Sequence, residues 1–169
     1  ESFGILQIDA HADLRNAYEG FEFSHASIMY NALKIEQVTQ LTQVGVRDIC
    51  QEEVDLITAD KRISCFYDHD LKKGRMNGKA FSKQIEEIIA SLPQKVYISF
   101  DIDGLDPKLC PNTGTPVPGG FEFQEAIEIL KALKLSGKEI IGCDLNEVGN
   151  HEWDANVGSR VLYQLCCYF

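Results

Sequence analysis

The sequence lacks three features that would each point to an easily recognised class of protein. It has no apolar run long enough to span a membrane, no extended run of basic residues, and no Cys-x-x-Cys pair among its six cysteines. A membrane-spanning helix needs about 20 consecutive apolar residues, and nucleic-acid binding needs a patch of Lys and Arg. The formal net charge of −10 also disfavours a nucleic-acid partner. We therefore expect neither a membrane nor a nucleic-acid partner.

The cysteines and the overall composition indicate an ordinary globular protein. Several cysteines lie inside apolar runs, where a thiol behaves as a small hydrophobic group. This usage favours a reducing compartment, so we expect a cytoplasmic location. The length of 169 residues, with 44% hydrophobic and 25% charged residues, suits a single domain. We expect one domain over residues 1–169.

Strand-like and helix-like segments alternate along the whole chain. Apolar runs predict strands at 5–8, 39–46, 63–67, 96–100 and 138–145. Helical spacing of apolar residues predicts helices at 24–35, 50–59, 79–92, 121–135 and 154–168, with a polar turn at 74–78 and a long loop at 107–120. Such alternation predicts the α/β class, with a parallel sheet sandwiched by helices in a three-layer α/β/α arrangement.

Two acidic clusters come directly after two of the predicted strands. Asp9, His11 and Asp13 follow the first strand, and Asp101 and Asp103 follow the strand at 96–100. Ligands bind at the carboxyl ends of strands in open α/β sheets, and side chains two residues apart share a face of an extended chain. Crowded carboxylates repel one another unless a cation holds them. Either cluster alone would be read as a solvated strand end, but the two together favour a pair of divalent metal ions. An oxygen-rich donor set with one imidazole suits Mn²⁺ better than Zn²⁺.

The two clusters lie within longer motifs that resemble those of a known enzyme family. Residues 9–13 (DAHAD) and 99–107 (SFDIDGLDP) are similar to two signature motifs of the ureohydrolases, the superfamily of arginase, agmatinase and formimidoylglutamase. Three stretches look more like agmatinase than arginase: residues 18–26, residues 44–47 followed by Glu52 and Glu53, and residues 114–120. The resemblance runs over nearly the whole chain and implies the arginase fold. It also implies a binuclear manganese centre and hydrolysis of a C–N bond in a guanidino compound to release urea.

The resemblance also implies which residues hold the two ions. Asp9 and Asp101 would bridge both of them, Asp13 would hold the first ion, and His11 and Asp103 would hold the second. A water molecule held between two such ions is acidic enough to act as the nucleophile near neutral pH.

Four further residues match positions that handle the substrate in this family. Glu147 would pair with the guanidinium group, and His25 would shuttle a proton to the leaving amine. Thr115 lies in a loop that resembles an active-site wall, and Arg15 lies where arginases meet the amino-acid end of the substrate. Taken alone, Glu147 could equally be a polar strand end, and His25 could be a residue that caps a helix locally.

The resemblance departs from the family pattern at the N-terminus. The first family motif, a Gly-Gly-Asp-His type strand end that gives a histidine to the first ion, is absent from residues 1–169. We therefore expect a C-terminal portion of a ureohydrolase that binds its first ion weakly and leaves a sheet edge exposed. An agmatine-like substrate is favoured, with arginase or formimidoylglutamase activity as the alternative. A non-catalytic metal-binding relative or inactive fragment is the alternative from another class. By resemblance, we expect a homo-oligomer, either a trimer or a hexamer.

Overall fold

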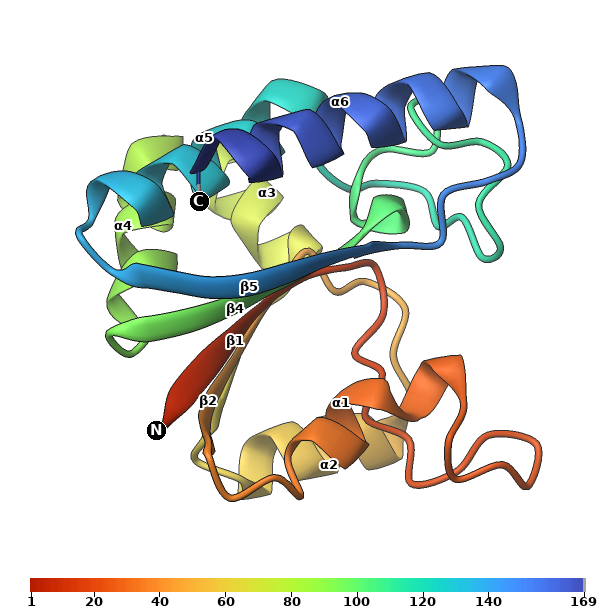
Figure 1. Cartoon of the computed structure of the whole chain (residues 1–169), viewed down its shortest axis with the longest axis vertical. Helices are drawn as coiled ribbons and strands as arrows, with labels where there is room; N and C mark the ends of the chain where they lie inside the picture. The colour runs from red at the N-terminus through yellow and green to blue at the C-terminus, as the bar shows by residue number, and fades with distance from the viewer. Residues whose placement is uncertain (169) are drawn as a thin grey trace.

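The computed structural model describes residues 1–168, and its centre is a five-stranded sheet in which every pairing is parallel (Figure 1). The strands are Phe3–Ile8 (β1), Val38–Val44 (β2), Ile63–Phe66 (β3), Lys95–Asp101 (β4) and Glu139–Asn146 (β5). Their order across the sheet is β3-β2-β1-β4-β5. The most N-terminal strand is therefore in the middle of the sheet.

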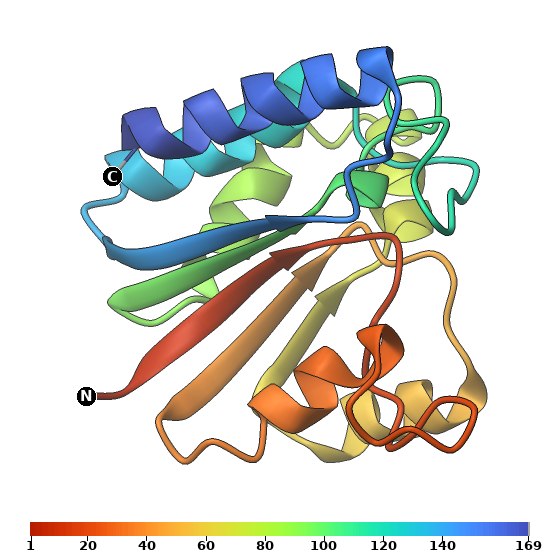
Figure 2. The same ribbon diagram turned by 45° about the vertical axis from the view of Figure 1, so that its right-hand side comes forward.

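Helices cover both faces of the sheet, as Figures 1 and 2 show. One face carries Ile28–Ala32 (α1) and Gln51–Ala59 (α2), and the other carries Asp68–Met76 (α3), Phe81–Ala90 (α4), Phe123–Leu135 (α5) and Glu152–Tyr168 (α6). Two 3₁₀ turns, His25–Ser27 and Ile102–Gly104, precede α1 and follow β4. No helix within residues 1–168 is long and apolar enough to cross a membrane.

Alternation of side chains along β1 explains why the two layers form. Leu6 and Ile8 are fully buried in the larger core, beneath the helices that follow β3 and β4. Ile5 points to the opposite face and joins the smaller core, which contains Met29 of α1 and Leu41 of β2. Because Gln7 and Asp9 have the same parity as Ile5, they belong to the α1 and α2 face.

The order of the strands places a ligand site next to β1. From β1 the chain moves outward to β2 and β3 through helices on one face, and it then returns to β4 on the other side of β1. Parallel crossovers are right-handed, so a reversal of direction across the sheet transfers the helices to the opposite face. The loops after β1 and β4 therefore diverge, and the crevice between them is where ligands bind in such folds.

The predicted fold class is confirmed, and two local expectations are wrong. The sequence predicts a polar turn at 74–78, but these residues are largely the end of α3, which begins at Asp68. The pattern gives no helix there because Leu71 is the only buried apolar residue of α3, so no periodicity is visible. The helix predicted over 24–35 consists of a 3₁₀ turn and one short α-helix that ends at Ala32. The strand order leaves β3 and β5 at the two edges of the sheet, and Ile141 of β5 is 41% exposed. The expectation that a missing segment leaves one edge uncovered stays a prediction.

Candidate metal centre

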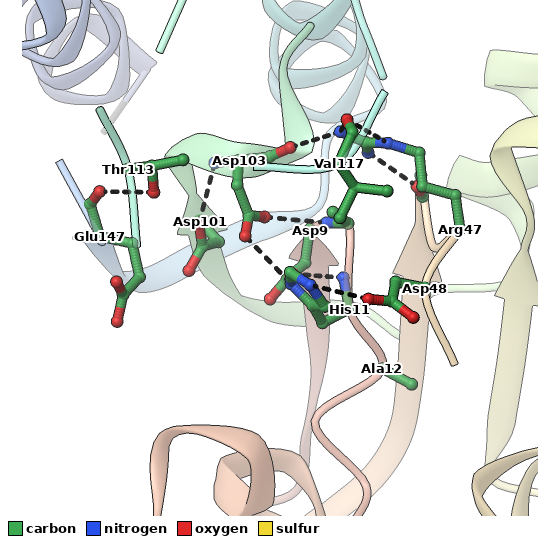
Figure 3. Close-up of polar contacts among 12 residues, drawn as sticks. Asp9, His11, Ala12, Arg47, Asp48, Asp101, Asp103, Thr113, Val117 and Glu147 are labelled. Carbon is green, nitrogen blue, oxygen red and sulfur yellow. Dashed lines mark hydrogen bonds and ion pairs between the residues drawn. The ribbon is translucent and has the colours of Figure 1, made fainter. Parts of the chain in front are cut away.

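The pairing of β1 with β4 brings the two acidic clusters together. Ile8 pairs with Phe100, so Asp9 and Asp101 occupy equivalent positions at the carboxyl ends of adjacent strands. Asp103 follows in the 3₁₀ turn, and its Oδ1 accepts a hydrogen bond from the Ala10 N–H at 3.0 Å. All of these carboxylates line one cavity of about 550 Å³ (Figure 3).

His11 lies between Asp9 and Asp103. Its Nδ1 is 3.0 Å from Oδ2 of Asp103 and 3.5 Å from Oδ1 of Asp9. One ligand atom from each of these three residues lies within 4.8 Å of the other two, which is close enough to share an ion. On the other side of the ring, Nε2 is 3.7 Å from Oδ2 of Asp48 (Figure 3). The ring of His11 therefore has carboxylates on both sides.

Asp13 lines the same cavity and has an unusual backbone conformation. Its φ of 53° is in the left-handed region, which Asp tolerates better than most residues. Its carbonyl oxygen accepts hydrogen bonds from the N–H groups of Met29 and Tyr30, and the next residue, Leu14, donates its N–H to Oε1 of Glu53. Glu53 is buried and also accepts from the Cys50 N–H through Oε2. These contacts from α1 and α2 hold the loop in its strained form.

Burial and mutual repulsion change the protonation of the cluster. Burial, together with the nearby charges of Asp9 and Asp103, raises the pKa of Asp101 to about 10. Burial and the charge of Asp9 likewise raise the pKa of Asp13 to about 8, and burial raises the pKa of Asp9 to about 6. Burial alone would lower the pKa of His11, but hydrogen bonds to Asp103 and Asp9 raise it to about 10. Burial alone would raise the pKa of Asp103, but its bonds to His11 and to the Ala10 N–H lower it. At neutral pH, Asp13 and Asp101 therefore hold protons, and His11 forms an ion pair with Asp103.

These donors fit divalent metal ions. Four aspartates and one histidine face one cavity, and Asp9 and Asp103 are each only 2% exposed. Without a cation, the repulsion in the cluster is relieved by protons and by the charge of His11. A divalent ion would replace those protons, because metal ligands bind in their deprotonated forms. Oxygen donors with one imidazole suit hard or borderline ions such as Mn²⁺.

Glu147 joins the cavity from the end of β5. Its φ is 60°, and its carbonyl oxygen accepts a hydrogen bond of 2.8 Å from Oγ1 of Thr113 (Figure 3). The loop that contains Thr113 passes so close that a Cβ atom on Gly114 would lie 3.0 Å from Oε2 of Glu147. Thr115 of this loop lines the cavity together with Glu147. The loop therefore lies against both the backbone and the side-chain carboxylate of Glu147.

His25 and Arg15 also line the cavity. The ring of His25 meets the ring of Tyr18 edge-on at 5.4 Å, and the guanidinium carbon of Arg15 lies 5.4 Å from the centre of the Tyr18 ring. The structure thus places all nine predicted site residues around one cavity: Asp9, His11, Asp13, Arg15, His25, Asp101, Asp103, Thr115 and Glu147.

Two residues that support the site were assigned no role from the sequence. Arg47 donates hydrogen bonds to the carbonyl oxygens of Gly45, Asp103, Leu105 and Val117, and it ties β2 to the loop after β4. Glu53 supports the Asp13 loop, as described above. Arg47 lies three residues after the end of β2, and Glu53 lies in the first turn of α2. A charged residue shortly after a buried strand was the signal that could have identified Arg47.

The cavity also has an apolar side. Ile5 of β1, Tyr97 of β4, and Met29 and Ala32 of α1 contribute to its lining. These residues lie on the α1 and α2 face of the sheet, next to the acidic cluster. The cavity therefore offers a negatively charged end and an apolar wall to a single ligand.

Comparisons with known proteins relate the whole chain to one family. A family model described as the arginase family matches residues 1–168. The N(1)-aminopropylagmatine ureohydrolase of Synechocystis is 38% identical over 149 residues, which cover 88% of this chain and 45% of that protein. The agmatinase of Pyrococcus horikoshii is 38% identical over 149 residues, which cover 88% of this chain and 48% of that protein. The chain thus spans about half the length of these relatives.

A comparison of structures agrees with the sequence matches. The arginase of Bacillus caldovelox superposes with a TM-score of 0.82 at 23% identity, over 98% of this chain and 60% of that protein. At this level of identity, the likeness shows the fold alone. It agrees with the arrangement of strands and helices described above.

Proposed function

We propose that this chain, which belongs to the arginase family, carries the centre of a manganese-dependent ureohydrolase that acts on an agmatine-like substrate. The reaction is hydrolysis of a C–N bond in a guanidino compound, with release of urea. The observation that supports this most directly is the convergence of Asp9, His11, Asp13, Asp101 and Asp103 on one cavity that also contains Glu147. Two of the four carboxylates are buried and two are half-buried. Charges taken out of water are costly unless they are paired, so the crowding of these four carboxylates indicates a cation site.

Each ion would be held by a separate set of side chains. We assign Asp9 and Asp101 to both ions, Asp13 to the first, and His11 and Asp103 to the second. The short contacts among Asp9, His11 and Asp103 support the second site. When bound, a pair of divalent ions would supply a water molecule of lowered pKa and would stabilise negative charge that develops in the reaction.

The remaining residues would bind the substrate and move protons. Glu147 is a carboxylate that could accept two hydrogen bonds from a guanidinium group and so orient it toward the aspartates. His25 lines the same cavity, and its imidazole would protonate the leaving amine. Thr115 would contact the substrate from the loop that follows β4.

The shape of the cavity favours a cationic substrate with an aliphatic chain. The guanidinium would lie at the acidic end, and a polymethylene chain would lie along Ile5, Met29 and Tyr97. The 38% identical relatives are named as an agmatinase and an N(1)-aminopropylagmatine ureohydrolase, and those names describe substrates of this kind. The cytoplasmic location and a trimeric or hexameric assembly stay predictions, and light scattering would test the assembly.

One observation favours a second candidate substrate. Arg15 lines the cavity, and a guanidinium can grip a substrate carboxylate. Such a contact would suit arginine or 4-guanidinobutyrate rather than agmatine. A relative from Pseudomonas aeruginosa, 30% identical over 182 residues, is named guanidinobutyrase. Substitution Arg15→Ala would raise KM for these carboxylate-bearing substrates if Arg15 binds them, and would leave KM for agmatine unchanged.

Urea release in the presence of Mn²⁺ tests the proposal. The substrates are agmatine, aminopropylagmatine, arginine, 4-guanidinobutyrate and formiminoglutamate, and formamide is measured for the last of these. Asp103→Asn should abolish turnover, whereas Asp55→Asn, which changes an exposed aspartate on α2, should leave it intact. Turnover that persists in Asp103→Asn would refute the metal mechanism, and no release from any substrate would refute the catalytic proposal.

A further inference from the structure

Two fully buried glutamines lie directly behind the proposed metal centre. Gln7 of β1 and Gln43 of β2 have no exposed surface, and they pair with each other across the two strands. Gln7 has the same parity as Asp9, so both side chains belong to the α1 and α2 face of the sheet. Neither glutamine touches the cavity or has a role in the chemistry proposed above.

The amide groups form a chain of hydrogen bonds that ends on Asp9. Nε2 of Gln43 donates to Oε1 of Gln7 at 2.7 Å, and Nε2 of Gln7 donates to Oδ2 of Asp9 at 2.8 Å. The other oxygen of Asp9, Oδ1, accepts the His11 N–H at 2.6 Å. Each carboxylate oxygen can accept two hydrogen bonds. Asp9 is therefore held at both oxygens, and each oxygen keeps acceptor capacity for another partner.

The same glutamines also hold the backbone of the acidic loop. Gln43 donates to the carbonyl oxygen of Ala12 at 2.6 Å, and Gln7 makes a longer contact of 3.4 Å with the carbonyl oxygen of His11. Gln7 and Gln43 thus hold the loop at Asp9, His11 and Ala12, and this loop carries three of the five proposed ligands.

The arrangement is poorly explained by stability alone. Buried positions in central parallel strands are normally filled by Val, Ile or Leu. Here two amides are buried instead, and Oε1 of Gln43 accepts no hydrogen bond from any described residue. A buried polar atom without a partner destabilises the folded state, so its presence calls for another explanation.

We propose that Gln7 and Gln43 are positioning residues that fix the Asp9 carboxylate and the loop at 9–13 for divalent-cation binding. The inference rests on the proposed metal centre. Partners that orient metal ligands in this way typically change metal affinity by about 10- to 100-fold when removed.

Calorimetric titration of the 169-residue chain with Mn²⁺ tests the proposal. Gln7→Leu should weaken binding by about tenfold or more. The double variant Gln7→Leu, Gln43→Leu should weaken Mn²⁺ binding to a similar extent. Because the double variant leaves neither glutamine amide without a partner, it still tests the proposal if the single variant misfolds. Gln40→Leu is the matched control, because Gln40 also lies on β2 but its Nε2 bonds to Ser64. We expect this variant to bind Mn²⁺ like the unaltered chain.

Thermal melts with and without Mn²⁺ separate positioning from a structural role. Positioning predicts that the rise in Tm caused by Mn²⁺ shrinks in the Gln7 variant and in the double variant. A lower Tm without metal, combined with unchanged Mn²⁺ affinity, would show that the glutamines only support the fold, and it would overturn the inference. Absence of Mn²⁺ binding by the unaltered chain would instead overturn the metal centre itself, and the inference with it.

Discussion

Binding of a divalent ion to the acidic cluster should release protons, and their number follows from the protonation of the ligands. In the metal-free protein, the pKa values of Asp101 and His11 are raised to about 10, and that of Asp13 is raised to about 8. These three groups are therefore protonated at pH 7. The pKa of Asp9 is raised only to about 6, so Asp9 has mostly lost its proton at that pH. Because ligands must be deprotonated to bind, full occupancy at pH 7 should release about three protons.

The sign of the pH dependence follows from competition between protons and the ion. Raising the pH removes the competing protons, so the apparent affinity for Mn²⁺ should increase steeply from pH 6 to pH 8 and more gradually as the pH approaches 10. Calorimetric titrations at pH 7 in buffers of different ionisation enthalpy would count the protons.

A matched pair of variants makes the measurement specific. Asp101→Asn removes one of the three protonated ligands and should reduce the release by about one proton, besides weakening binding. Asp55→Asn changes an exposed carboxylate of α2 and should not alter the count. Binding without proton release at pH 7 would refute the protonation pattern derived for the cluster.

Three further predictions concern the same site. Because the pKa of Asp101 is raised, the metal-free folded state keeps a proton that the unfolded chain loses above about pH 4. The stability of the metal-free protein therefore falls as the pH rises toward 10. Asp101→Asn should raise the metal-free Tm, and the rise should be larger at about pH 9 than at about pH 5. Arg47→Met should lower the free energy of unfolding, measured by urea titration, by about 3 kcal/mol, because several carbonyl oxygens lose their donor. The control Arg160→Met changes an exposed residue of α6 and should alter the free energy of unfolding little. Glu147→Gln should lower kcat/KM for agmatine by about 100-fold while leaving Mn²⁺ affinity unchanged, and a comparable loss of metal binding would contradict its assignment to the substrate.

The sequence predicted those parts of the fold that depend on apolar patterning. Strands β1 and β4 are mostly buried and read as short apolar runs, interrupted only by Gln7 in β1 and Ser99 in β4, so their ends, and with them Asp9 and Asp101, could be located without a structure. Helix α3 could not be found in this way. Its stability comes from one buried leucine, an acidic first turn and a basic last turn, which leave only a weak trace in a hydrophobicity pattern.

The sequence predicts the proposed ligands better than it predicts the contacts that support them. Arg47 acts on carbonyl oxygens of residues as distant in sequence as Val117, and no spacing rule predicts such a contact. Gln7 and Gln43 appear in the sequence as polar interruptions of two strands, and only the register of β1 against β2 shows that they face each other. The comparisons confirm the family; the roles of the individual site residues stay predictions.

Two of the proposed site residues, Asp13 and Glu147, share a backbone feature that links the fold to the proposed chemistry. Asp13 and Glu147 both have a positive φ, at 53° and 60°, and each follows the carboxyl end of a strand. A non-glycine residue in this region costs about 1–3 kcal/mol, and it persists only where its neighbours hold it. Asp13 is held by the N-terminus of α1, and Glu147 by Thr113. Two of the three non-glycine residues with positive φ among residues 1–168 therefore line the cavity, where a site that binds ions and substrate together requires a fixed geometry.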